Sequence, residues 1–417
     1  MTVPVRFIHA ADLHLDAPFG AIDAQDRRVR DALAASTYEA LDAIVATCID
    51  NQVDFLVLSG DVFNARERGV RSQFAFARAA ATLERAGIPI YMVHGNHDPA
   101  TGAGGVVMIP DNVHVFPHDR VERVVFERDG EAVCALYGRS FRVAAETADL
   151  ASEFRRDPAD TIAIGVLHTN VGARPDYDDY APSSPQDLIS ARMDYWALGH
   201  IHKPEVVLTR PLAVYAGCPQ GLDPTQTGLR GCYLVTLGDG PATAEFIPTA
   251  SVIWESATVE CGELGTLEGV RAAVRSVCDA ARTAADGRPV VLRVELIGRS
   301  EAHHDLALPA ALKALTDEVR REAMDAEQWV WVDRVRDHTR PAIDLDALRH
   351  AEDFSGDIVR LADELLADPE AASELVAAEL RALLDRVGNL VTPPDPADVV
   401  ARARDLALDR LLAEDDR

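Results

Sequence analysis

The sequence has few lysines and little positive charge overall. Only Lys203 and Lys313 are lysines, and 41 basic residues face 68 acidic ones, so the formal net charge is −27. This excess excludes a protein that attracts nucleic acid through a broad basic surface. A phosphate-bearing substrate would have to be held locally. Arginine suits such a contact because its guanidinium is planar, although a bias in genome composition explains the preference equally well.

Paired cysteines and long apolar runs are also lacking. The six cysteines are scattered without a C-x-x-C pair, which argues against a disulfide framework or a structural zinc site. No apolar run approaches the roughly 18 residues of a membrane span, and the first residues lack the segments of a signal peptide. We therefore expect a cytoplasmic protein that does not engage a membrane.

A chain of 417 residues is too long for one compact core and is expected to form two or three domains. Short β-branched runs alternate with helical stretches, at about 27–49 and 72–86, over residues 1–245. This alternation predicts an α/β core of two packed sheets with flanking helices. A sparser pattern predicts a small α/β capping domain over 250–340, with helices at about 264–284 and 310–323. Residues 341–417 form an acidic helical tail that could dock a partner.

Five polar motifs stand where predicted strands end: Asp12-Leu13-His14, Gly60-Asp61, Gly95-Asn96-His97-Asp98, His168, and Gly199-His200-Ile201-His202. Side chains alternate along an extended chain, so Asp12 and His14 are expected to face one side, as are His200 and His202. Carboxylate, imidazole and carboxamide groups without thiolates suit manganese, iron or zinc. Two such cations can clamp phosphoryl oxygens for in-line displacement. The motifs therefore predict a two-metal phosphoesterase.

In this order the motifs resemble those of the calcineurin-like metallophosphoesterases. Residues 7–19 and 94–99 resemble the SbcD-type and Mre-type DNA repair exonucleases, and residues 216–221 and 231–235 resemble the YhaO-like branch. The resemblance implies a double-strand exonuclease and single-strand endonuclease that acts in DNA repair as a homodimer. It also implies an SMC-like ATPase partner of the SbcC or YhaN type. Because this chain has no G-x-x-x-x-G-K-[ST] motif, nucleotide-driven motion would have to come from that partner.

The resemblance also implies a role for each motif residue. One metal would be held by Asp12, His14, Asp61 and His202, and the other by Asp61, Asn96, His168 and His200, with manganese the expected ion. His97 would stabilise transition-state charge or protonate the leaving oxygen, and Asp98 would orient its surroundings. Asn64 stands where the family typically has aspartate or histidine. We expect its side chain to hold the His97 ring.

Several alternatives remain open at this level. Arg66, Arg68 and Arg71, and likewise Lys203, could bind DNA phosphates or belong to solvated charged loops. The other histidines, such as His9 and His94, are expected to be packed or solvated. The metal motifs do not define the substrate. The rivals are a phosphoesterase for cyclic nucleotides or phosphoproteins and a weakly active scaffold that binds DNA ends.

Overall fold

A computed structural model describes residues 4–19, 26–64, 69–101, 110–174, 177–387 and 394–415. The chain forms two compact units. The first comprises Met1–Glu255 and Arg282–Val291, and the second comprises Ser256–Ala281 and Leu292–Arg417. The second unit contains most of the predicted capping domain together with the helical tail, and the division into three domains stays a prediction.

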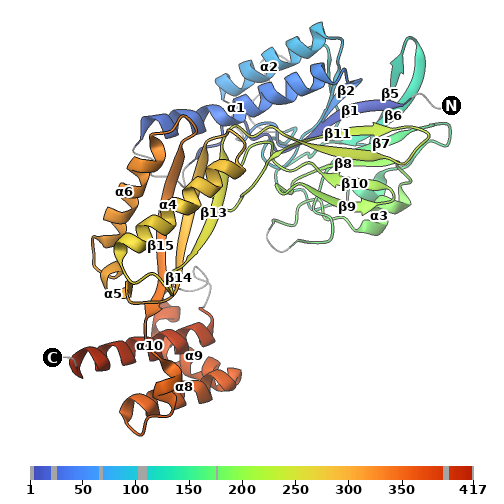
Figure 1. The fold of residues 1–417 in the computed structure, drawn as a ribbon. Helices are drawn as coiled ribbons and strands as arrows, with labels where there is room; N and C mark the ends of the chain where they lie inside the picture. The colour runs from blue at the N-terminus through green and yellow to red at the C-terminus, as the bar shows by residue number, and fades with distance from the viewer. Residues whose placement is uncertain are drawn as a thin grey trace. The chain divides into compact units, whose positions relative to one another are not determined.

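Two six-stranded sheets form the first unit (Figure 1). The first sheet has the order β12-β11-β1-β2-β3-β4, with bounds Thr243–Pro248, Gly231–Leu237, Val5–Ala10, Phe55–Ser59, Ile90–Val93 and Val113–Val115. The second has the order β5-β6-β7-β8-β10-β9, with bounds Glu122–Arg128, Glu131–Arg139, Ala163–His168, Tyr195–Gly199, Leu212–Tyr215 and Glu205–Thr209. Strands β1 to β4 run parallel, as do β6, β7, β8 and β10. Each run of parallel strands therefore has its carboxyl ends along one edge.

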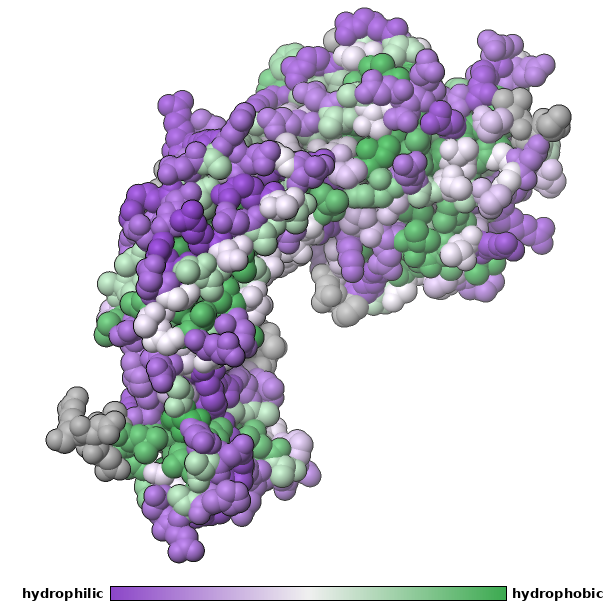
Figure 2. Space-filling model, viewed as in Figure 1, coloured by the Kyte–Doolittle hydropathy of each residue, from purple (hydrophilic) through white to green (hydrophobic). Residues whose placement is uncertain are grey.

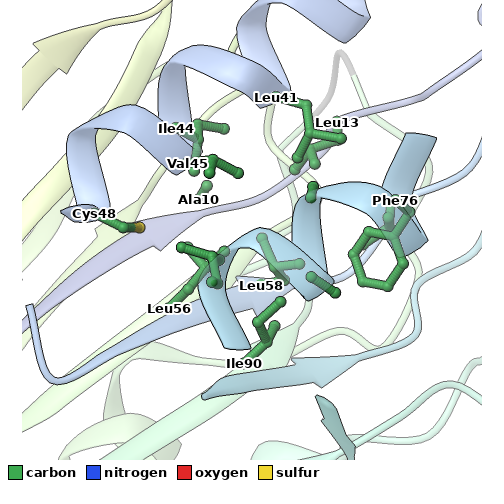
Figure 3. Close-up of a cluster of buried hydrophobic side chains, with 14 of the residues drawn as sticks. Ala10, Leu13, Leu41, Ile44, Val45, Cys48, Leu56, Leu58, Phe76 and Ile90 are labelled. Carbon is green, nitrogen blue, oxygen red and sulfur yellow. The ribbon is translucent and has the colours of Figure 1, made fainter. Parts of the chain in front are cut away.

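The core of this unit lies in layers. Helices α1 (Arg27–Asp50) and α2 (Val70–Arg85) cover the outer face of the first sheet, where Ala10 of β1 lies among apolar side chains such as Leu41 and Leu56 (Figure 3). Ile8 of β1 belongs to the same cluster. The preceding residue, Phe7, points to the space between the two sheets. The outer face of the second sheet packs against α3 (Pro185–Ser190) and the short 3-10 helix Ala151–Glu153. The predicted two-sheet α/β architecture with flanking helices is confirmed.

Helix α1 has the length and apolar content of a membrane-spanning helix, which the sequence analysis did not anticipate. Its apolar side chains, among them Leu41, Ile44 and Cys48, are buried against the first sheet. Core helices of this kind meet the same criteria of length and composition. In this structure α1 is a core helix.

The second unit contains a three-stranded sheet with the order β13-β14-β15, whose bounds are Ile253–Glu260, Val290–Ser300 and Val330–Pro341. Its helices are α4 (Leu267–Ala284), α5 (His303–Leu306) and α6 (Ala311–Met324), followed in the tail by α7 (Leu345–Arg349), α8 (Phe354–Ala367), α9 (Pro369–Val387) and α10 (Pro396–Asp415). Asp405 of α10 accepts hydrogen bonds from Arg299 at 2.8 Å and from Arg340 at 3.3 Å. These contacts fix α10 to strands β14 and β15.

Candidate metal centre

The predicted ligands lie where five parallel strands end. β1, β2 and β3 of the first sheet and β7 and β8 of the second all lead into them. Three overlapping groups have ligand atoms within 4.8 Å of one another: Asp12, His14 and His202; His14, Asp61 and His97; and Asp12, Asp61 and His168. Asn96 and His200 both lie next to His168. Asn96 Oδ1 is 3.0 Å from His168 Nε2, and the ring centroids of His168 and His200 are 5.3 Å apart. The structure thus brings all seven predicted ligands together.

Left-handed backbone conformations position four of these residues. Asp12, His14, Asp61 and His200 have φ angles of 51°, 43°, 52° and 100°. The chain is therefore not extended there, and the predicted alternation of side chains along an extended segment is wrong for these residues. Such conformations cost roughly 1–3 kcal/mol each in non-glycine residues, and aspartate and histidine tolerate them better than most. Neighbouring loops hold the turns in place, since Asp12 N–H donates to Gly60 O and His14 N–H donates to Asp61 O, both at 3.0 Å.

The two oxygens of the Asp61 carboxylate have different surroundings. Oδ1 accepts the main-chain N–H of His97 at 2.8 Å. Oδ2 lies 3.4 Å from His168 Nε2 and 3.9 Å from His14 Nε2. One oxygen is thus fixed by the backbone while the other faces histidines from both predicted metal sites. This arrangement fits a carboxylate shared by two cations.

Hydrogen bonds at the far side of two rings select which nitrogen faces the centre. His168 Nδ1–H donates to Ser59 O at 2.9 Å, so Nε2 faces Asp61. His200 Nε2–H donates to Asp178 O at 2.9 Å, which leaves Nδ1 available. Such second contacts fix ring orientation in metal-binding histidines. The side-chain amide of Gln226 likewise contacts His202 Nδ1 at 2.9 Å.

His14 and His202 approach each other closely. Their Nε2 atoms are 3.1 Å apart, and the buried Nδ1 atom of His14 has no hydrogen-bond partner among the described residues. Two converging imidazole nitrogens next to the Asp12 and Asp61 carboxylates form a nitrogen and oxygen donor set. The chemistry of this set fits a divalent cation such as manganese, iron or zinc.

His97 is exposed at the rim, and its ring stands perpendicular to that of His14 with centroids 4.7 Å apart. Its Nδ1 atom lies 3.2 Å from the main-chain carbonyl oxygen of Asn64. We expected the side chain of Asn64 to make this contact. That expectation is wrong, because the main-chain carbonyl of Asn64 is the acceptor. Residue 64 holds the ring whatever its side chain.

Asp98 lies behind the centre. Its buried carboxylate accepts the N–H of Gly95 at 2.8 Å through Oδ1 and the N–H of Val62 at 2.9 Å through Oδ2. These bonds join the loop that follows β3 to the loop that follows β2. Asp98 therefore acts on loop geometry, in line with the orienting role that the resemblance implies.

Three motif glycines surround the His168 ring. A Cβ atom at Gly60, Gly95 or Gly199 would lie 2.5, 2.8 or 2.8 Å from an atom of that ring. A Cβ at Gly199 would also lie 2.0 Å from the carbonyl oxygen of Ser59. Because no real Cβ atom approaches so closely, these motifs need glycine to let the imidazole reach the centre.

Burial and mutual charge set the ionisation of the centre. Burial raises the pKa of the Asp12 carboxyl to about 7, and it lowers the pKa of His14 to about 3 and that of His202 to about 4. Burial also opposes charge on His168, but Asp61 and Asp12 outweigh it and raise the His168 pKa to about 9. Despite burial, His168 in turn holds the pKa of Asp61 well below its usual range. Cations bound at the centre would take over the compensating charge that His168 supplies.

A cavity of about 350 Å³ opens onto the centre, lined by Asp61, Asn96, His97, Tyr177, Asp178, His200 and His202. Sequence reasoning missed Tyr177, Asp178 and Gln226, which lie in loops without a motif.

The other residues considered from the sequence lie in different surroundings. Lys203 is exposed next to the cavity. Arg71 lies over the Tyr38 ring at 4.4 Å, while Arg66 and Arg68 fall outside the described residues. His9 is packed, with contacts to Tyr195 Oη at 2.9 Å and Ser59 Oγ at 3.0 Å.

Comparison with known proteins identifies the family. Residues 5–204 match the calcineurin-like phosphoesterase model, and residues 254–340 match the middle domain of metallophosphoesterase YhaO. The uncharacterized metallophosphoesterase YhaO of Bacillus subtilis is 31% identical over 349 residues, which cover 84% of this chain and 85% of that protein. The chain belongs to the calcineurin-like metallophosphoesterase family. The match to the YhaO middle domain brings the similarity into the second unit.

Two further relatives with lower identity are named as a DNA repair protein and as a nuclease subunit. The DNA double-strand break repair protein Mre11 of Thermoplasma acidophilum is 27% identical over 50% of this chain and 55% of its own length. The SbcD component of the SbcCD nuclease of Bacillus subtilis is 25% identical over 54% of this chain and 64% of its own length. The resemblance to SbcD-type and Mre-type proteins is thus confirmed at the level of sequence similarity.

Proposed function

We propose that this metallophosphoesterase hydrolyses phosphodiester bonds in DNA with two divalent cations, for which manganese is the expected ion. The observation that carries the proposal is the complete donor set around Asp61 Oδ2, with His14 on one side and His168 on the other. His97 stands at the rim of the same cavity. The similarity to Mre11 and to the SbcD component of SbcCD supports DNA as the substrate.

The chain's own residues have separate tasks in this proposal. Asp12, His14, Asp61 and His202 would hold one cation, and Asp61, Asn96, His168 and His200 the other. Bound cations would polarise the phosphoryl oxygens and activate water for attack. The carbonyl of Asn64 accepts the Nδ1–H of His97, so in the doubly protonated ring Nε2–H is the group that would pass a proton to the leaving oxygen, and Nδ1 keeps the other proton.

We also propose that an SMC-like ATPase is the partner of this protein in DNA repair in the cytoplasm. The groove in the helical tail is the feature that supports a docking partner. An apolar groove of about 380 Å³ lies among α8, α9 and α10, and Leu361 and Leu375 in its lining are 59% and 44% exposed. Figure 2 shows apolar side chains at the surface of these helices. Exposed apolar grooves on helices accept an apolar helix face. The name of the SbcCD relative indicates a nuclease built from more than one type of polypeptide.

One experiment tests the activity. Purified protein with manganese receives linear duplex DNA, circular single-stranded DNA, cyclic nucleotides and a phosphopeptide in parallel, and the His97→Ala variant serves as the matched control. We expect nucleotide release from linear duplex and cleavage of the circle, both lost with a chelator. Turnover confined to cyclic nucleotides or phosphopeptide would replace the nuclease proposal. Tight binding of DNA ends without turnover would instead favour a scaffold.

A further inference from the structure

Three neighbouring cavities extend from the metal centre along the first unit. The cavity at the centre shares Tyr177 and His202 with a neighbouring cavity of about 720 Å³. That cavity shares Lys203, Thr225 and Arg230 with a third one of about 420 Å³. Because adjacent cavities have lining residues in common, they lie next to one another, and we call the three together the exit groove.

Arg230 is the buried cation of the exit groove. It is 6% exposed, and its Nη1 and Nη2 atoms donate to His202 O at 2.6 Å and Thr227 O at 3.0 Å. Both of these acceptors are neutral carbonyls, and the Nε atom of Arg230 has no hydrogen-bond partner among the described residues. A buried guanidinium without an opposing charge is costly, so an anion placed here would be strongly favoured.

The other charged residues of the groove differ in how far they are already paired. Arg174 makes a two-pronged ion pair with Glu205, at 2.7 and 2.8 Å, and so has little charge to offer. Asp223 accepts hydrogen bonds from the side chains of Thr225 and Gln226. Lys203 is exposed and lines the second and third cavities, and its charge adds only a smaller contribution to the low pKa of Glu205, whose carboxylate is already bound by Arg174. Lys203 and Arg230 are thus the two cations that a ligand can use.

The outer end of the groove adds apolar surface. Phe246 and Leu229 line the third cavity beside Lys203 and Arg230, and Leu229 is 46% exposed. Sites for single-stranded nucleic acid typically combine two features. Cations line the path of the sugar-phosphate backbone, and apolar and aromatic side chains contact the bases. A small diester with one phosphate would not reach this end.

We infer that the exit groove binds the nucleotides next to the scissile bond of a single strand, with Arg230 and Lys203 on the adjacent phosphate. This inference rests on the proposed function and adds the surface that would hold a single strand, which must carry at least two phosphates to reach it. The competing role for Arg230 is a brace that only supports the carbonyl of His202. Loss of a brace would reduce the amount of bound metal. Loss of a phosphate contact would instead raise the Michaelis constant and weaken the salt dependence.

The test compares substrates that differ in phosphate number. Full-length protein with manganese hydrolyses the p-nitrophenyl ester of thymidine 5′-phosphate, which has one phosphate, and oligothymidylates of two to eight nucleotides. The variants are Arg230→Gln and Lys203→Gln, and Arg27→Gln is the control because its side chain is 87% exposed on α1. We expect wild-type kcat/KM to rise over the first few nucleotides. Each groove variant should lower the ratio of oligonucleotide to single-phosphate kcat/KM about 10-fold, the effect of one charged hydrogen bond.

Further readouts separate the two roles. The slope of log kcat/KM against log salt should become shallower by about 0.7 for each lost phosphate contact. Bound manganese in Lys203→Gln should equal that of wild type. Suppose that wild type cleaves oligothymidylates but Lys203→Gln changes neither the ratio of oligonucleotide to single-phosphate kcat/KM nor the salt slope. The groove inference is then overturned, even if Arg230→Gln does not fold. If wild type cleaves only the single-phosphate ester, the proposed function itself fails.

Discussion

The Nδ1 atom of His97 lies 3.2 Å from the main-chain carbonyl oxygen of Asn64. A contact of this kind survives a change of side chain. We therefore expect Asn64→Ala to keep turnover within about twofold, whereas His97→Ala should lower kcat about 100-fold or more, the usual contribution of a general acid. Steady-state kinetics and metal analysis of both variants measure this. Equal losses in the two would mean that the Asn64 side chain acts on the ring after all.

Asp61 should be the most sensitive ligand because its Oδ2 atom faces histidines of both predicted metal sites. Asp61→Ala is expected to weaken binding of both cations, by more than the roughly 100-fold seen for residues that only support ligands. Metal content by mass spectrometry after gel filtration measures the loss. Two retained equivalents with wild-type turnover would contradict the coordination scheme.

The glycines around His168 give a test of packing. Gly199→Ala should lower Tm by roughly 2–12 °C, the consequence of an overpacked core in a domain of this size, and should release metal. The matched control is Gly240→Ala, where an added Cβ has no atom within 4 Å. Differential scanning fluorimetry with and without manganese reports both effects. If Gly199→Ala behaves like the control, His168 does not need the space that these glycines leave.

Proton release should accompany metal binding. The pKa values of His168 and Asp12 are raised to about 9 and about 7, so at pH 7 the first group is protonated and the second about half so. Ligands must lose these protons, and we expect about one to two protons released per protein at pH 7. The number should fall as pH rises through 9, because both groups are then already deprotonated. Calorimetric titration of manganese in two buffers of different ionisation enthalpy counts the protons, and a value near zero at pH 7 would contradict the pairing of His168 with Asp61.

The tail groove should be sensitive to charge. Leu361→Glu and Leu375→Glu place a carboxylate in the apolar lining and are expected to weaken co-purification of an SMC-like ATPase about 10-fold or more. Leu308→Glu is the control, because Leu308 is a 58% exposed leucine outside the groove. These substitutions are sharper than removal of the tail, which would leave Arg299 and Arg340 without Asp405. Undiminished association in both groove variants would argue against docking at this site.

The ligand residues could be predicted from sequence because metal chemistry restricts their types and strand ends restrict their places. Asp12, His14 and Asp61 each follow an apolar run that had to be a buried strand. The left-handed turns at these residues could not be predicted, since they depend on main-chain bonds between loops such as Asp12 N–H to Gly60 O.

Other parts of the site depend on tertiary structure alone. Tyr177 and Arg230 lie in loops without a motif, and only the fold brings them to His202. The acceptor for His97 was expected on a side chain because a sequence displays side chains and not carbonyl positions. The three-part domain division, the manganese preference, the cytoplasmic location and the homodimer stay predictions.

The position of β1 in its sheet has a consequence for the order of folding. β1 precedes every ligand, yet its neighbours are β2 and β11, and β11 follows the last ligand, His202. Contacts between segments so far apart form slowly because a long loop must close first. During synthesis the loop with Asp12 and His14 therefore has only one flanking strand until Gly231–Leu237 has emerged. Metal capture should be among the last steps in folding of the first unit, after its two sheets are complete.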